Sequence, residues 1–174
     1  TPFVRSLIRA AEAGKQVACV IELKARFDEA RNLLWAQELQ QVGAHVTYGL
    51  MGLKTHTKVA LVVRKEGRDL RCYAHIGTGN YHVKTARLYT DVGLLTCDPI
   101  LTADVVKLFH YLTGCSRAPQ FDKLLIAPIN MRQRFLERIE REIEHHRAGR
   151  PARIIAKMNQ VEDLEMARAL AAAS

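Results

Sequence analysis

Apolar residues in the first half of the chain switch repeatedly between strand and helix spacing. Residues 16–23 form a nearly continuous apolar run, which is typical of a strand covered on both faces. In residues 28–42 apolar side chains recur every three positions, which is typical of a helix. The predicted elements are a helix over 3–13, a strand over 16–23, a helix over 28–42, a strand over 45–48, and two hairpin strands over 54–64 and 70–76. This order predicts an α/β layered domain with a mixed sheet.

The second half predicts a break in the organisation of the chain. The expected elements are a strand over 92–97, a helix over 103–112, an irregular stretch over 114–130, an amphipathic helix over 132–146 and a linker over 147–151. A predicted strand over 152–158, followed by a capping-box pattern from Asn159 to Glu162, repeats the strand-then-helix order of residues 16–42. We therefore expect one domain over 1–148 and the start of a second over 149–174.

Composition narrows the class of partner. The chain has 174 residues, 48% of them apolar, and a net charge of +8, which favours polyanions such as nucleic acid, an acidic membrane surface, nucleotide or a phosphate polymer. The four cysteines are scattered without zinc spacing, as expected in a reducing cytosol. No apolar stretch approaches the roughly 18 residues of a membrane span. Because the sequence starts at Thr1 without Met, we expect a segment of a longer protein.

The run from Gly52 to Lys58 carries the strongest candidate chemistry. In a strand beginning at residue 54, His56 and Lys58 would emerge on one face, while Thr57 and Val59 point to the other. An imidazole can serve as a nucleophile toward phosphorus, and a fixed cation can neutralise the phosphoryl oxygens. A solvated edge strand would carry the same two side chains facing water.

A glycine-rich turn, Gly77-Thr78-Gly79-Asn80, follows the second hairpin strand. If the hairpin is in register, this turn lies at the same end of the sheet as Lys58. Its glycines would let backbone N–H groups approach phosphate, and Asn80 could hydrogen-bond the histidine or a substrate. Taken alone, the four residues are better interpreted as an ordinary turn.

His-x-Lys followed by Gly-Thr-x-Asn resembles the signature of the phospholipase D superfamily, although residues 62–67 lack the acid that commonly follows the lysine. More narrowly, and over nearly its whole length, the chain resembles the bacterial polyphosphate kinases of phospholipase D-like type, and four blocks carry the resemblance. These blocks are Glu22–Glu29, Gly52–Lys58, Tyr73–Tyr81 and Lys84–Asp91. The resemblance implies a phospholipase D-like layered α/β domain with a mixed sheet flanked by helices, the first of two such catalytic domains.

The resemblance also implies a reaction and its residues. The terminal phosphate of ATP would pass reversibly to the end of polyphosphate, with His56 as the phosphohistidine and with Lys58 and Asn80 completing the catalytic set. Arg26 matches an arginine placed where Mg²⁺ and phosphate meet. A guanidinium is a donor only, so Arg26 would clamp phosphate beside the metal rather than ligate it. Tyr89 matches a tyrosine that contacts the nucleotide.

Several of these positions also have structural interpretations. Arg26 could be a surface partner of nearby acids, and Tyr89 could be a half-buried core tyrosine. His75 could position the residues that contact the substrate without touching the substrate itself, or it could be a structural histidine. Arg87 could add to the positive field that attracts polyanion or be a solvated loop charge.

The sequence is also compatible with two other functions. One is a phospholipase D-like nuclease or phosphodiesterase, and the other is a non-catalytic polyanion-binding module. For the kinase, the resemblance implies ATP, ADP and polyphosphate as partners, Mg²⁺ as cofactor, no nucleic acid, and a homo-oligomeric full-length protein. It implies a cytoplasmic location, with peripheral association with the inner membrane. The chain alone is expected to be inactive because the second domain is missing.

Overall fold

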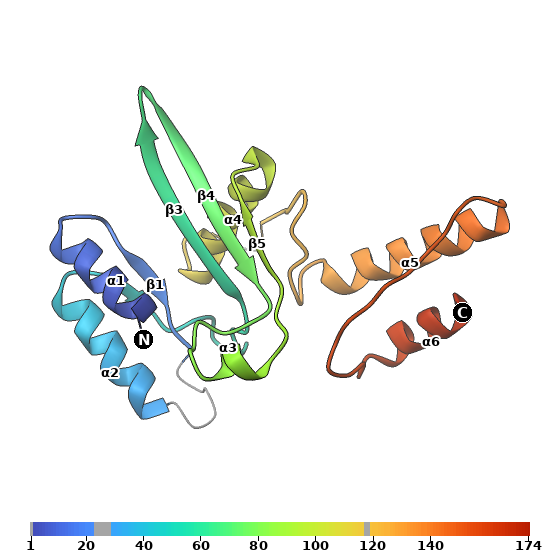
Figure 1. Ribbon diagram of the computed structural model, residues 1–174, viewed down its shortest axis with the longest axis horizontal. Helices are drawn as coiled ribbons and strands as arrows, with labels where there is room; N and C mark the ends of the chain where they lie inside the picture. Colours follow the sequence, from blue (N-terminus) through green and yellow to red (C-terminus); the bar gives the residue numbers. More distant parts are fainter. Residues whose placement is uncertain (1, 23–28, 117–118) are drawn as a thin grey trace. The chain divides into compact units, whose positions relative to one another are not determined.

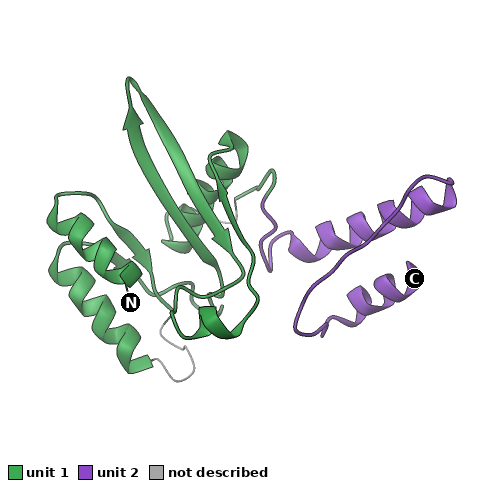
Figure 2. Cartoon of the chain, viewed as in Figure 1, with its two compact units in different colours: residues 1–123 green, residues 124–174 purple. Residues whose placement is uncertain are grey.

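The computed structural model describes residues 2–22, 29–116 and 119–174. The chain divides into two compact units, residues 1–123 and residues 124–174 (Figure 2). Arg26 lies outside the described residues, so the expectation for its side chain stays a prediction.

Unit 1 alternates helices and strands along the chain, as the sequence predicts (Figure 1). In chain order its elements are α1 (Pro2–Glu12), β1 (Ala18–Val20), α2 (Glu29–Gln41), β2 (His45–Thr47), β3 (Lys58–Glu66), β4 (Asp69–Gly77), α3 (Thr85–Leu88), β5 (Gly93–Thr96) and α4 (Pro99–Leu112). The α/β class is therefore confirmed.

The strands of unit 1 form two small sheets where one mixed sheet was expected. β1 and β2 pair in parallel, and β3, β4 and β5 form an antiparallel sheet in that order. The β3–β4 hairpin pairs along its whole length, from Glu66 opposite Asp69 to Lys58 opposite Gly77. Its two-residue turn includes Gly67 at a φ of 63°, a conformation that glycine adopts without steric cost.

Helix α4 packs on β3 and β4 and forms the core with them (Figure 1). Val105 and Leu108 on the helix and Ala74 on β4 are at most 2% exposed. The helix begins four residues earlier than the sequence reading placed it. Asp98 caps its N-terminus by accepting a hydrogen bond from the backbone N–H of Leu101 at 2.8 Å, and a proline follows at the first helical position.

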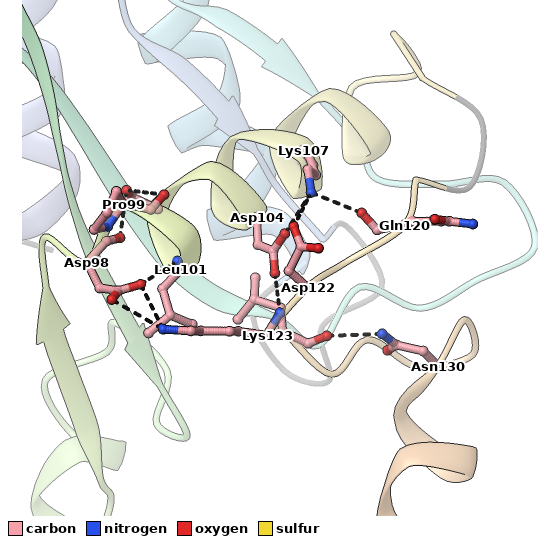
Figure 3. Close-up of polar contacts among 11 residues, drawn as sticks. Asp98, Pro99, Leu101, Asp104, Lys107, Gln120, Asp122, Lys123 and Asn130 are labelled. Atoms are coloured by element: carbon pink, nitrogen blue, oxygen red, sulfur yellow. Dashed lines mark hydrogen bonds and ion pairs between the residues drawn. The ribbon is translucent and has the colours of Figure 1, made fainter.

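A buried carboxylate on α4 anchors the end of unit 1 (Figure 3). Asp104 is fully buried and accepts hydrogen bonds from Lys107 Nζ at 3.0 Å and from the backbone N–H of Lys123 at 2.7 Å. Lys107 also pairs with Asp122 at 2.9 Å, and Lys123 Nζ pairs with Asp98 at 3.2 Å. These contacts hold residues 120–123 against α4.

Unit 2 contains α5 (Met131–Arg147) and α6 (Leu164–Ala172). Arg132 on α5 forms ion pairs with Asp163, at 2.6 Å, and with Glu165. α5 therefore packs with the residues that follow it. The boundary between the two compact units lies between residues 123 and 124, whereas the sequence predicted a domain boundary between residues 148 and 149.

The expected strand over 152–158 is wrong. These residues form no strand, and Ile155 is 77% exposed. A segment with strand-forming residues becomes a strand only when another strand pairs with it, and none of the described strands does so. The helix that follows is capped by Asp163, which accepts from the Met166 N–H at 2.9 Å, and not by Asn159. No helix in the described part of the chain combines the length and apolarity needed to cross a membrane.

We predict that Asp104→Ala lowers the free energy of unfolding by about 2–3 kcal/mol, because it leaves the Lys123 N–H without its charged acceptor. Urea unfolding followed by circular dichroism measures the change. Asp122→Ala is the control, since the Asp122 side chain is 69% exposed and its loss should change stability little. Equal destabilisation by both variants would show that Asp104 has no special role.

Candidate functional site

His56 lies just before β3 and not within it. The sequence reading started this strand at residue 54, but the structure starts it at Lys58. The imidazole is exposed and has no hydrogen-bond partner among the residues that the structure describes. The backbone carbonyl of His56 accepts a hydrogen bond from Lys58 Nζ at 2.7 Å. The two residues are therefore brought together by the lysine bonding back to the histidine backbone, and not by a shared strand face.

Lys58 is buried to 9% exposure at the end of the sheet. It lies opposite Gly77, and Gly77 in turn lies opposite Gly93 on β5, so the three residues form one row across the strands. The turn with Asn80 starts at Gly77. The expected register is thus confirmed, and the glycine-rich turn begins beside Lys58.

Asp91 is the functional candidate that sequence reasoning missed. Its Oδ1 accepts a hydrogen bond from Thr78 Oγ1 at 3.1 Å, and the Thr78 N–H donates to the carbonyl of Val92 at 3.0 Å. A Cβ added at Gly79 would collide with the Asp91 carboxylate. The turn therefore holds a carboxylate at the same end of the sheet as Lys58. No local spacing links Asp91 to the His-x-Lys motif, so only the folded chain shows the proximity.

His75 occupies the space that two glycines leave open. A Cβ on Gly77 would lie 2.9 Å from its Cε1, and a Cβ on Gly93 would lie 2.6 Å from its Nε2. Its Nδ1 is 2.7 Å from the hydroxyl of Tyr81, whose ring stacks on Phe3 with centroids 4.4 Å apart. Because side chains alternate along strands and His75 pairs with residue 60, His75 and Lys58 lie on the same face of the sheet. His75 thus lies two residue pairs along the sheet from Lys58, with the Tyr81 hydroxyl as its hydrogen-bond partner.

Three further predicted residues, Asn80, Arg87 and Tyr89, lie at the surface. Asn80 is exposed, and its side chain has no hydrogen-bond partner in the described part of the chain. Arg87 is exposed on the short helix α3, where a loop was expected. Tyr89 directly follows α3 and is 61% exposed, so its interpretation as a half-buried core tyrosine is wrong. These exposed side chains are available to a ligand.

Burial and neighbouring charges shift the pKa values of both His56 and Lys58. Partial desolvation, and after it the positive charges of Lys58 and Lys54, lower the pKa of the His56 imidazole. The neutral ring, which is the nucleophilic form, is therefore favoured at neutral pH. Burial lowers the pKa of the Lys58 ammonium, while the negative charge of Asp91 acts in the opposite direction and favours the charged form.

The described residues do not form a protein cage for a divalent cation. Among them there is no group of three or more His, Cys, Asp or Glu side chains placed to hold an ion. Magnesium in phosphate-transfer sites usually keeps waters and binds substrate phosphates together with one or two carboxylates. The donor set of the described residues therefore does not fit a magnesium ion held by protein ligands alone.

The structure defines an α/β domain that carries an exposed histidine and a buried lysine at the end of an antiparallel sheet. Residues 1–118 match the family model described as polyphosphate kinase C-terminal domain 1, and residues 124–174 match polyphosphate kinase C-terminal domain 2. The first match covers more than half of the chain, so the chain belongs to the polyphosphate kinase C-terminal domain 1 family.

Similar proteins agree with this assignment. The chain is 59% identical over 174 residues to a polyphosphate kinase of Synechocystis and 56% identical over 163 residues to one of Streptomyces coelicolor. It covers 24% and 22% of their respective lengths, while the alignments span 100% and 94% of this chain. The crystal structure of polyphosphate kinase from Porphyromonas gingivalis matches with a TM-score of 0.85 at 36% identity, over all of this chain and 29% of that one. The chain thus spans about a quarter of the length of the curated relatives it matches.

We predict that Lys54→Gln raises the pKa of His56, because the variant removes one of the two positive charges that lower it. The titration of the His56 Cε1–H resonance, followed by NMR, measures the shift. Lys65→Gln is the matched control, since it neutralises a lysine at the other end of β3. A His56 pKa that is unchanged in Lys54→Gln would contradict this account of the site.

We predict that Asp91→Asn lowers the pKa of Lys58 further, because it removes the charge that opposes the effect of burial. The amide oxygen can still accept the hydrogen bond from Thr78, so the turn should keep its conformation. NMR titration of the lysine Cε resonances in selectively labelled protein gives the pKa. Asp69→Asn, at the far tip of the hairpin, serves as the control. If Lys58 titrates as in the unmodified protein, Asp91 does not stabilise its charge.

Proposed function

We propose that the protein containing this chain is a polyphosphate kinase that transfers the terminal phosphate of ATP reversibly to the end of polyphosphate through a phosphohistidine on His56. The observation that supports this most directly is the state of His56. Its ring is exposed, its pKa is lowered, and its backbone is bonded to Lys58. An accessible neutral imidazole beside a fixed positive charge is suited to accept a phosphoryl group.

The transfer would proceed in two steps. The unprotonated ring nitrogen of His56 attacks the terminal phosphorus of ATP, so that an N–P bond forms while the O–P bond to ADP breaks. The other ring nitrogen keeps its proton. An oxygen at the end of polyphosphate then attacks the same phosphorus, so that a new O–P bond forms and the N–P bond breaks. The positive charge of Lys58 stabilises the negative charge that builds up on the phosphoryl oxygens.

The other predicted residues would bind the substrates. Asn80 would donate a hydrogen bond to a phosphoryl oxygen or to His56, and Tyr89 would contact the nucleotide. Arg26 would bind a phosphate group through two parallel N–H···O hydrogen bonds. Arg87 would contribute to the positive electrostatic field around the site. Mg²⁺ would arrive bound to the phosphates of ATP. His75, hydrogen-bonded to Tyr81, would support the site from the same face of the sheet, two residue pairs away from Lys58.

The wider setting of the domain is also a proposal. We expect a phospholipase D-like layered arrangement in the complete protein, a homo-oligomer in solution, and a cytoplasmic location with peripheral association with the inner membrane. Nucleic acid is not an expected substrate. Because relatives are about four times as long as this chain, the chain by itself is expected to lack turnover.

The test uses the full-length protein, γ-labelled ATP and Mg²⁺. We expect acid-labile, alkali-stable phosphate on His56, which His56→Ala abolishes because it removes the nucleophile. His45→Ala is the matched control, since His45 is an exposed histidine on β2 and should leave the label unchanged.

Two results would contradict the proposal. Label that persists in His56→Ala would place the phosphorylated residue elsewhere. Cleavage of a phosphodiester without ATP, and without any labelled intermediate on the kinase reaction path, would favour a phospholipase D-like nuclease.

A further inference from the structure

Glu22 connects the first sheet to the loop that carries His56. The carboxylate oxygen Oε2 of Glu22 accepts a hydrogen bond from the backbone N–H of Thr55 at 2.8 Å, across 33 positions of sequence. Glu22 follows β1, and Thr55 directly precedes His56. Hydrogen bonds to an ionised acceptor are about twice as strong as those between neutral groups.

Residues 50–57, the histidine loop, pair with none of the strands that the structure describes, so contacts of this kind fix the path of the loop. β3 begins only at Lys58, and the backbone before it is bonded on each side of His56 by a charged side chain. On one side Glu22 accepts from the N–H of Thr55, and on the other Lys58 donates to the carbonyl of His56. A Cβ on Gly49 would lie 2.6 Å from Thr55 Oγ1, so the Thr55 side chain also packs closely against that turn.

Glu22 is itself held by two elements. The backbone N–H of the preceding residue, Ile21, donates to the carbonyl of Thr47 at 2.9 Å, which extends the pairing of β1 with β2. The carbonyl of Glu22 accepts a hydrogen bond from Asn32 Nδ2 of α2 at 3.0 Å. Its carboxylate therefore extends from a backbone position that a strand and a helix both define.

We infer that Glu22 is a positioning residue for phosphoryl transfer to His56. It fixes the backbone at Thr55, and through this backbone it fixes where the exposed His56 ring lies. The inference rests on the proposed function, since it assigns Glu22 a role at that same site. The ring has no hydrogen bond to another described side chain, so its position depends on the backbone that Glu22 and Lys58 hold. Small displacements of a reacting group, of about 1 Å, can lower a rate about 10²-fold.

The experiment compares Glu22→Ala, Glu22→Gln and the control Glu38→Ala in the full-length protein. Glu38 is an exposed glutamate on α2, so its variant removes the same charge without touching the loop. Two quantities are measured: the rate of His56 phosphorylation at several ATP concentrations, and peptide-resolved hydrogen exchange over residues 50–57.

Glu22→Ala should lower the maximal phosphorylation rate about 10²-fold with little change in the half-saturating ATP concentration. It should also speed exchange over residues 50–57. Glu22→Gln keeps an acceptor oxygen and should recover most of the rate, while Glu38→Ala should behave as the unmodified protein.

The inference is overturned if Glu22→Ala phosphorylates at the unmodified rate, if it changes only the half-saturating ATP concentration, or if exchange over residues 50–57 is unchanged. Failure of the unmodified protein to label His56 would instead reject the proposed function. The exchange measurement does not need phosphorylation, so in that case it still decides whether Glu22 holds the loop.

Discussion

The hydrogen-bond register between β3 and β4 is the constraint on which the site depends. It places Lys58 opposite Gly77 and so brings the start of the glycine-rich turn to the end of the strand that follows His56. If the pairing of β3 with β4 shifted by one residue, every side chain of β3 would turn to the other face of the sheet. Lys58 would then point into the apolar core between the sheet and α4. The apolar residues that face α4 therefore fix the position of the lysine as well as the core.

Burying a lysine at this position has a cost that its surroundings offset. An ammonium that leaves water loses solvation, and the lowered pKa of Lys58 reflects that loss. The carbonyl of His56 supplies a hydrogen bond, and Asp91 supplies an opposing charge within the same end of the sheet. Lys58 thus serves two purposes at once, because it holds the histidine loop and keeps positive charge beside the imidazole.

Local patterns in the sequence predicted most of the elements and the central histidine and lysine. The helices α1, α2 and α5 follow from apolar spacing, and the hairpin follows from its turn residues. The strand start at Lys58 could not be predicted in this way, because the N–H of Thr55 bonds to the Glu22 carboxylate rather than to a neighbouring strand. Contacts between distant segments leave no periodic signal in the chain, which is also why Asp91 was missed.

The glycines of the turn have a packing role besides the phosphate-binding role that the sequence predicts for them. The sequence suggested that these glycines let backbone N–H groups approach phosphate. Neither Gly77 nor Gly79 has a positive φ, so the backbone conformation does not require glycine at either position. The space of a Cβ is taken instead by the His75 ring at Gly77 and by the Asp91 carboxylate at Gly79. These glycines thus leave room for the side chains of His75 and Asp91, and a larger residue at either position would displace one of them.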